Sequence, residues 1–243
     1  MQAVVPAAGE GTRLRPLTED TPKGLLEVAG QPLLSHCFDR LAELRVDRIV
    51  VVIGYRGQQI VDRYGDEYDD VPLQYVTQDE RLGLAHALAQ AEPRIDDGFV
   101  VYNGDNVFGS PPNRALRVHD RPGIDGTILV EEATRETARE TGVVTTDEDG
   151  VVTGIVEKPD DPPSTLITTG VYTLPPSIFE ACRKITPSDR GEYELADAID
   201  RFCERGGTVA AVEFDGWRVN VNTPEDLAEA TRMLEGYTDG QRS

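Results

Sequence analysis

Short apolar runs alternate with helix-like patterns through the first half of the chain. The runs have the length and composition of buried strands, and they lie at residues 2–7, 48–55, 73–76 and 99–105. Between the first two, apolar residues from Leu33 to Leu44 fall on one face of a helix that follows Pro32. "LAHALAQAE" and residues 112–118 predict two more helices. This alternation predicts a parallel sheet covered by helices on both faces.

The second half has a different pattern, in which strand-like runs follow one another closely. These runs are "GTILVEE", "GVVTTDEDGVVTGIVEKP" and "TLITTGVYTL", and Asp149-Gly150 in the second predicts a hairpin turn. Later elements are expected as helices at 177–182 and 194–204 and strands at 208–214 and 217–221. A last helix begins after Thr223, which suits a helix cap, and residues 236–243 are expected to form a polar, frayed tail.

The chain shows no internal repeat and no linker. We therefore predict one α/β domain over residues 1–235, with a mixed sheet. Its first half covers about residues 1–110 and its second half about residues 111–235.

Charge is the strongest compositional signal. Asp and Glu number 44 against 24 Lys and Arg, which gives a net charge of −20, and only Lys23, Lys158 and Lys184 are lysine. Such a surface repels nucleic acid and anionic lipid, so we expect neither as a partner. Salt relieves the self-repulsion, because the Debye length falls to about 3 Å near 1 M salt. We therefore expect the cytoplasm of a halophilic archaeon; the alternative is an ordinary acidic cytosolic protein.

Neither a membrane span nor a secretion signal is expected. The chain has no apolar run of 18 residues, and no basic leader precedes its short apolar start. Cys37, Cys182 and Cys203 are odd in number and lack the spacing of metal ligands, so we expect buried thiols in a reducing compartment. The three histidines are scattered in the same way and are expected at the surface or behind a site.

A glycine-rich turn follows the first strand. Gly9-Glu10-Gly11-Thr12-Arg13 is not a dinucleotide fingerprint, because Leu14 stands where the third glycine would be. Two residues without Cβ let backbone N–H groups approach an anion, and Arg13 adds a planar fork for phosphate oxygens. Lys23 can reach the same anion. The sequence thus predicts a polyphosphate site; the alternative is a plain turn with surface bases.

Asp105 ends a buried strand within "NGDN". Ligands bind at the carboxyl ends of strands in open parallel sheets, and Mg²⁺ prefers one or two carboxylates with phosphate oxygens and water. The alternative is a simple turn, because Gly-Asp-Asn is good turn chemistry. Glu157 and Lys158 end another strand, and Asn220 and Asn222 end a third. Taken singly, the Glu-Lys pair is also typical of a solvated edge.

Together and in this order, these motifs resemble those of the sugar-1-phosphate nucleotidylyltransferases, the group that includes glucose-1-phosphate uridylyl- and thymidylyltransferases. The most specific piece is "AAGEGTRLRPLTEDTPKGLLEV", which is similar to the family's G-x-G-T-R…P-K-x-L signature. "QDERLGLAHA", "GDN", "VEKP", "TGVY", "RGEYEL" and "WRVNVNTPEDL" follow in family order. The resemblance runs from Ala3 to about Leu234 and is greatest to the short haloarchaeal UTP–glucose-1-phosphate uridylyltransferases.

The resemblance implies a fold and an activity. The fold is the nucleotide-diphospho-sugar transferase fold: α/β, Rossmann-like, with a mixed, mostly parallel sheet flanked by helices. The reaction joins UTP or dTTP to a hexose 1-phosphate, glucose 1-phosphate foremost, and releases pyrophosphate. It needs positioning and charge neutralisation but no general base.

The resemblance also implies a role for each matching residue. The first half would bind the nucleotide through Ala8, Gly9, Gly11, Thr12, Arg13, Gln78, Gly83 and Leu84. The second half would bind the sugar phosphate through Gly142, Glu157, Lys158, Thr169 and Tyr172. Catalysis would fall to Arg13, Lys23 and Asp105, and Mg²⁺ would be held by Asp105 and Asn220.

Two departures from the family pattern keep alternatives open. Asn220 stands where many glucose-1-phosphate enzymes carry aspartate, as it does in N-acetylglucosamine-1-phosphate uridylyltransferases, whereas Thr168 differs from the asparagine of that group. The alternatives are an enzyme for N-acetylglucosamine 1-phosphate, a guanylyl- or cytidylyltransferase for another phosphate, or a non-catalytic regulatory paralogue that binds nucleotide sugars. The expected partners are small-molecule substrates, and a homo-oligomer is left open.

Overall fold

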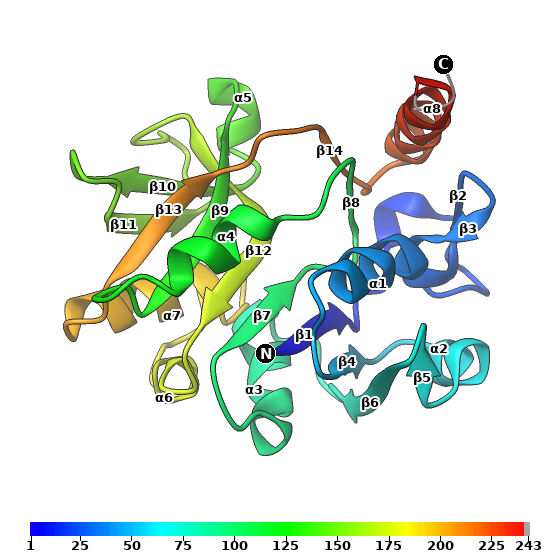
Figure 1. Cartoon of the computed structure of the whole chain (residues 1–243), viewed down its shortest axis with the longest axis horizontal. Coiled ribbons are helices and arrows are strands. Elements are labelled where there is room, and N and C mark those ends of the chain that lie inside the picture. The colour runs from blue at the N-terminus through cyan, green and yellow to red at the C-terminus, as the bar shows by residue number, and fades with distance from the viewer. Residues whose placement is uncertain (241–243) are drawn as a thin grey trace.

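The computed structural model describes residues 1–240, and a ten-stranded sheet forms its centre (Figure 1). Eight strands follow the order β11-β10-β12-β7-β1-β4-β6-β5, while β9 pairs with β12 and with β13. The first half of the chain contributes β1 (Gln2–Ala7), β4 (Ile49–Ile53), β5 (Glu67–Tyr68), β6 (Val71–Thr77) and β7 (Phe99–Tyr102). The pairs β7–β1, β1–β4 and β4–β6 are parallel, as the strand-helix alternation predicts.

The second half of the chain makes the sheet mixed. Its strands are β9 (Gly126–Glu132), β10 (Gly142–Thr146), β11 (Val152–Glu157), β12 (Leu166–Leu174) and β13 (Val209–Glu213). β12 runs antiparallel to β7 on one side and to β9 on the other, so it joins the two halves through hydrogen bonds. β10 and β11 form the predicted hairpin. The division into halves near residue 110 stays a prediction.

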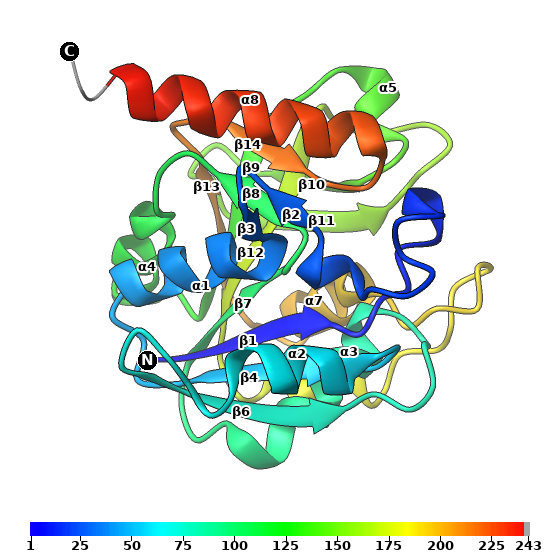
Figure 2. The same cartoon turned by 90° about the vertical axis from the view of Figure 1, so that its right-hand side faces the viewer.

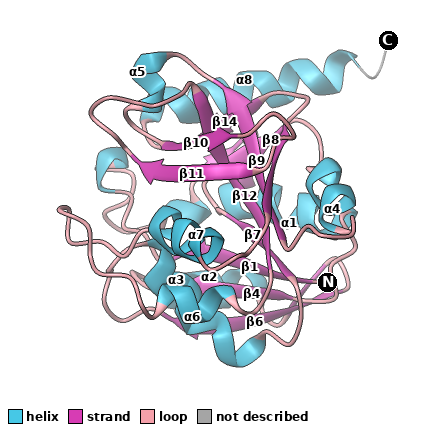
Figure 3. Cartoon of the chain, turned by 90° about the vertical axis from the view of Figure 1, so that its left-hand side faces the viewer, coloured by secondary structure: helices cyan, strands magenta, loops and turns pink. Residues whose placement is uncertain are grey.

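Helices cover both faces of the sheet (Figure 3). One face packs against α3 (Leu84–Ala91), α6 (Ile178–Cys182) and α7 (Leu195–Glu204), and the other against α1 (Leu33–Glu43), α2 (Gly57–Tyr64) and α4 (Asn113–His119). β7 shows how the two cores arise. Phe99 and Val101 enter the first core, and Val100 and Tyr102 enter the second, because successive strand residues point to opposite faces.

A smaller layer adjoins the sheet on the α1 side (Figure 2). It contains two antiparallel pairs, β2 (Glu27–Val28) with β3 (Gln31–Pro32) and β8 (Asn106–Phe108) with β14 (Arg218–Asn220). The last helix, α8 (Pro224–Gly240), packs over them through Leu227 and Ala230. A short helix, α5 (Arg135–Ala138), lies after β9. None of the helices in residues 1–240 is long and apolar enough to cross a membrane.

The start of α8 is capped as predicted, but its end differs. Thr223 Oγ1 accepts from the Asp226 N–H at 3.2 Å, and Asp226 Oδ2 accepts from the Thr223 N–H at 2.8 Å. The expected frayed tail is wrong for residues 236–240, because the helix continues to Gly240. Polar residues are compatible with a helix, and Gly236 within it costs only about 1 kcal/mol. Residues 241–243 of the predicted tail lie outside the described residues.

Candidate active site

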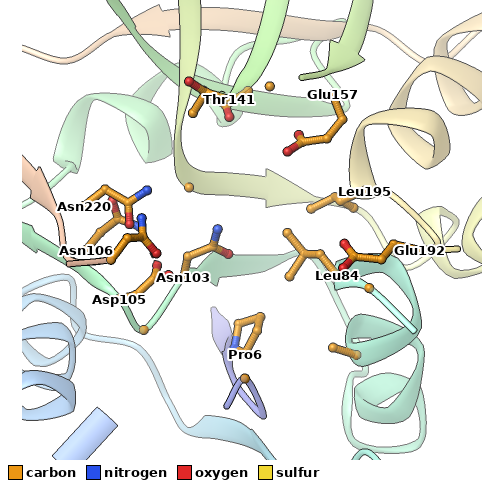
Figure 4. A pocket seen from close by; sticks show the side chains of 18 of the residues that line it. Pro6, Leu84, Asn103, Asp105, Asn106, Thr141, Glu157, Glu192, Leu195 and Asn220 are labelled. Atoms are coloured by element: carbon orange, nitrogen blue, oxygen red, sulfur yellow. Dashed lines mark hydrogen bonds between the residues drawn. The ribbon is translucent and has the colours of Figure 1, made fainter. Parts of the chain in front are cut away.

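The carboxyl ends of β1, β6 and β7 open into a cleft of about 760 Å³, which β10, β11 and β12 bound on the other side (Figure 4). The cleft brings together residues that are far apart in the chain. Every residue that the sequence predicts for the site lines it: Ala8, Gly9, Gly11, Thr12, Arg13, Lys23, Gln78, Gly83, Leu84, Asp105, Gly142, Glu157, Lys158, Thr169, Tyr172 and Asn220. Their individual roles stay predictions.

The glycine-rich turn packs against Lys23. Gly11 has a φ of +64°, and a Cβ there would lie 3.0 Å from Thr18 Cγ2 and 3.1 Å from Lys23 Cβ. Thr18 also donates its hydroxyl to the Gly11 carbonyl at 2.8 Å. Glycine at position 11 is therefore required by both backbone and packing. Gly9 is different, because a Cβ there would meet nothing within 4 Å, so its small size leaves room for a ligand.

Lys23 and Asp105 form an ion pair at the floor of the cleft. Lys23 Nζ lies 2.9 Å from Asp105 Oδ2 and 3.0 Å from Asn222 Oδ1, and the lysine side chain is only 14% exposed. A largely buried charge is costly unless it has a partner of opposite sign. Each ion supplies the partner that the other needs. The sequence predicts both residues for the site, but it does not predict this contact.

The oxygen atoms around Asp105 fit a magnesium ion. Asp105 Oδ1 accepts from Asn106 Nδ2 at 3.0 Å, and Asn220 lies opposite Asn106 in the β8–β14 pair. Asn220 Oδ1 is buried and has no hydrogen-bond partner, so an acceptor is left for a cation (Figure 4). Within residues 1–240, no three His, Cys, Asp or Glu side chains gather to form a metal site by themselves, so any metal here would rest on fewer such ligands. One carboxylate with one free amide oxygen is a sparse ligand set of the kind that Mg²⁺ completes with phosphate and water.

Gln78 lines the cleft with its amide nitrogen turned toward the protein. The Gln78 side chain is buried, and its Nε2 lies 3.2 Å from the Gly83 carbonyl oxygen and 2.9 Å from His86 Nδ1. A carbonyl only accepts, so the atom facing it must be the nitrogen. Gly83 has a φ of +97°, and a Cβ there would lie 2.7 Å from the Tyr193 carbonyl oxygen. The backbone at Gly83 therefore tolerates no side chain.

Glu157 of the second half lies on the opposite side of the cleft from Asp105 (Figure 4), and Lys158, next to it in the chain, also lines the cleft. Lys158 Nζ lies 3.6 Å from Glu157 Oε1. Burial raises the pKa of Glu157, and the nearby Lys158 only partly opposes that shift. A Cβ at Gly142 would lie 3.0 Å from Glu157 Oε2 and 3.0 Å from Thr168 Oγ1. Gly142 therefore keeps space open beside the carboxylate.

Thr169 and Tyr172 are buried residues that line this side of the cleft. Thr169 donates its hydroxyl to the Leu129 carbonyl at 2.9 Å. Burial raises the pKa of Tyr172 well above its ordinary value, so it stays protonated.

Sequence reasoning missed several polar residues that line the cleft, among them Asn103, Asn106 and Arg218. Arg218 belongs to the same strand as Asn220, two residues before it. Residues two apart in a strand point to the same face, so the alternation of Arg218, Asn220 and Asn222 in "WRVNVN" was a usable signal.

Comparison with known proteins identifies the family. The profile of the family described as nucleotidyl transferase matches residues 2–236. The chain belongs to the nucleotidyl transferase family. This confirms the resemblance that the motifs indicate, and the solved structures of similar fold confirm the predicted fold class.

Several nucleotidyl transferases are similar over nearly the whole chain. The UTP–glucose-1-phosphate uridylyltransferase AglF of Haloferax volcanii is 47% identical over 238 residues, which cover 98% of both proteins. The glucose-1-phosphate thymidylyltransferase of Streptomyces antibioticus is 34% identical over 96% of this chain and 66% of its own. The structure of a UDP-glucose pyrophosphorylase complexed with UDP-glucose superposes with a TM-score of 0.87 at 26% identity, covering 97% of this chain and 98% of that one.

A longer relative of another kind is also similar. The bifunctional protein GlmU of Methanocaldococcus jannaschii is 33% identical over 96% of this chain, which spans 54% of GlmU.

We expect Glu157→Gln to raise the melting temperature at neutral pH. Burial raises the pKa of Glu157, so ionising it in the folded state costs free energy, and stability falls as pH rises through that raised pKa. Glutamine carries no charge and escapes this loss. The gain, measured by thermal unfolding, should therefore grow as the pH rises from the ordinary pKa of a glutamate toward neutral.

The matched control is Glu148→Gln, which removes one charge from an exposed position. It should change the melting temperature little across the same range. A gain at Glu157 no larger than at Glu148 would contradict the assigned burial cost.

Proposed function

We propose that this nucleotidyl transferase is a Mg²⁺-dependent enzyme that joins UTP or dTTP to a hexose 1-phosphate, with glucose 1-phosphate as the foremost substrate. The main support is the cleft, in which the glycine-rich turn, the Lys23–Asp105 pair and the Glu157–Lys158 pair face one space. The 47% identity to a UTP–glucose-1-phosphate uridylyltransferase over 98% of both chains supports the same substrates.

In the proposed reaction, an oxygen of the sugar phosphate attacks the α-phosphorus of the triphosphate. A phosphorus–oxygen bond forms to the sugar phosphate, the bond to the β,γ-diphosphate breaks, and pyrophosphate leaves. The attacking oxygen is already anionic, so the protein need not remove a proton. The task of the protein is to bring two polyanions together, and we assign this to Arg13, Lys23 and Lys158. A cation 4 Å from a phosphate charge contributes about 4 kcal/mol at an effective dielectric constant near 20.

Asp105 and Asn220 are the residues that would hold Mg²⁺. The metal, when bound, would supply charge neutralisation at the phosphates. The unpartnered Asn220 amide oxygen supports this assignment, because it gives the asparagine a use that its protein neighbours do not provide.

The orientation of Gln78 supports a pyrimidine base with a keto edge. Because Gly83 and His86 both face the amide nitrogen, the amide oxygen is the atom left for the base. An oxygen acceptor matches the ring N–H of uracil or thymine. Turning the amide over would place its oxygen against the Gly83 carbonyl oxygen, which is repulsive.

N-acetylglucosamine 1-phosphate is the second candidate for the sugar substrate. Asn220 and the similarity to GlmU favour it. Thr168, whose hydroxyl lies near the Gly142 position, stands where that group of enzymes carries asparagine.

The charge of −20 and the similarity to a Haloferax protein lead us to infer a salt-rich cytoplasm as the working environment. A homo-oligomer stays a prediction.

We expect Lys23→Ala to lower kcat by about 100-fold to 1,000-fold, the range for removing one group that stabilises developing charge. The measurement is steady-state pyrophosphate release. Lys184→Ala is the control, because Lys184 pairs with Glu180 outside the cleft. Equal effects of the two substitutions would contradict a role for Lys23 in stabilising charge during the reaction.

Stability should rise with salt. In about 2 M KCl the carboxylates repel one another over a few ångströms only, so the melting temperature should be higher than in about 20 mM KCl. Thermal unfolding at the two concentrations tests this. Equal melting temperatures and equal activity would favour an ordinary acidic protein.

A grid of triphosphates and sugar phosphates tests the function as a whole. Pyrophosphate release would be measured in molar KCl with Mg²⁺ for UTP, dTTP, CTP, GTP and ATP against glucose 1-phosphate, N-acetylglucosamine 1-phosphate, galactose 1-phosphate and mannose 1-phosphate. We expect turnover with UTP or dTTP and glucose 1-phosphate. Turnover confined to N-acetylglucosamine 1-phosphate would select the second candidate, and UTP binding without any turnover would favour the regulatory paralogue.

A further inference from the structure

Arg218 occupies an unusual position at the edge of the cleft. Its side chain is only 7% exposed and forms an ion pair with Glu131 of β9. One guanidinium nitrogen, Nη1, donates to Asn106 Oδ1 at 2.6 Å, and Nε is buried without a hydrogen-bond partner. Such a buried cation needs its acceptors held in place, so this contact restricts Asn106 as well as Arg218.

Arg218 determines which way the Asn106 amide points. A guanidinium group can only donate, so the atom of Asn106 that faces it must be the oxygen. The Asn106 nitrogen is thereby directed to Asp105 Oδ1, 3.0 Å away. Asp105 Oδ2 is left for Lys23 at 2.9 Å. Figure 4 shows Asn106, Asp105 and Asn220 side by side.

The neighbouring strand leaves space for this arrangement. Gly170 of β12 has a φ of +82°, and a Cβ there would lie 2.8 Å from Asn106 Nδ2. The register of β12 against β9 shifts between Thr168 and Tyr172, around this glycine. The irregular stretch of β12 therefore makes room for the amide that Arg218 orients.

We propose that Arg218 is a positioning residue of the metal subsite, acting through Asn106 to hold the Asp105 carboxylate in the orientation that binds Mg²⁺. The proposal rests on the proposed function only in taking Asp105 as a metal ligand. Residues that orient a metal ligand typically affect metal affinity about 10-fold to 100-fold when they are replaced. The competing explanation is that Arg218 only ties β14 to β9 through Glu131.

The test measures Mn²⁺ affinity by electron paramagnetic resonance in the presence of UTP, with Asp105→Asn to assign the signal to this site. All variants are made in a Glu131→Gln background, because removing Arg218 alone would leave the Glu131 carboxylate without its partner. Glu131 does not line the cleft, so this background should bind Mn²⁺ within about twofold of the wild type. Cooperative thermal unfolding is checked for each variant.

In that background, Arg218→Met and Asn106→Leu should each weaken Mn²⁺ binding about 10-fold or more. Because both act on the same carboxylate, the double variant should bind Mn²⁺ no less tightly than the single variant with the lower Mn²⁺ affinity. Three results would overturn the proposal. The first is a double variant whose loss of Mn²⁺ affinity is the product of the two single losses. The others are a loss below about twofold for Arg218→Met, and a loss from Glu131→Gln alone as large as that from Arg218→Met. So would Mn²⁺ binding that does not depend on Asp105. Normal Mn²⁺ binding by a wild-type protein that releases no pyrophosphate would refute the proposed function, while this comparison would still decide the role of Arg218.

Discussion

Lys23 and Asp105 meet at the floor of the cleft although 82 residues separate them in the chain. Three segments must come together for that contact: the turn after the signature glycines, the end of β7, and the stretch after β14 that supplies Asn222. The two ions carry opposite charges in a largely buried place, so neither can be removed without stranding the other. Gly11 packs on the lysine from one side, and Asn106 holds the aspartate from the other.

Placement of the few cations distinguishes this cleft from the rest of an acidic molecule. Two of the three lysines line it, together with Arg13, Arg81 and Arg218. Some of these are paired with carboxylates of the cleft, as Arg81 is with Glu10. Opposite charges held close together leave the cleft nearly balanced, whereas the outer surface is strongly negative. An anionic substrate is therefore attracted by local cations that the net charge of the chain hides.

Much of the fold follows from local sequence pattern. Where an element does not follow from it, the structure shows a physical reason. β1 and β7 are continuous valine-rich runs, so their burial is predictable; β1 has the predicted bounds, whereas β7 ends at Tyr102 and not at Asp105. α2 was not predicted, since "GQQIVDRY" is mostly polar and buries little beyond Ile60. The strand predicted at 217–221 is confirmed as β14, but β8 was not predicted, because it forms by pairing with β14 across more than a hundred residues and no local pattern encodes that pairing. For the same reason, motifs could predict residues that line the cleft, whereas no local pattern predicts the Arg218–Asn106 contact.

The backbone contact between the nucleotide side and the sugar side has a mechanical consequence. The Tyr193 N–H donates to the Leu82 carbonyl at 2.7 Å, and the Ala85 N–H donates to the Tyr193 carbonyl at 3.0 Å. β12 adds a continuous ladder to β7 at the other end of the cleft. A hinge that swung the two sides apart would have to break both sets of hydrogen bonds. The open rim of the cleft therefore gives substrates a route that leaves both sets of hydrogen bonds intact.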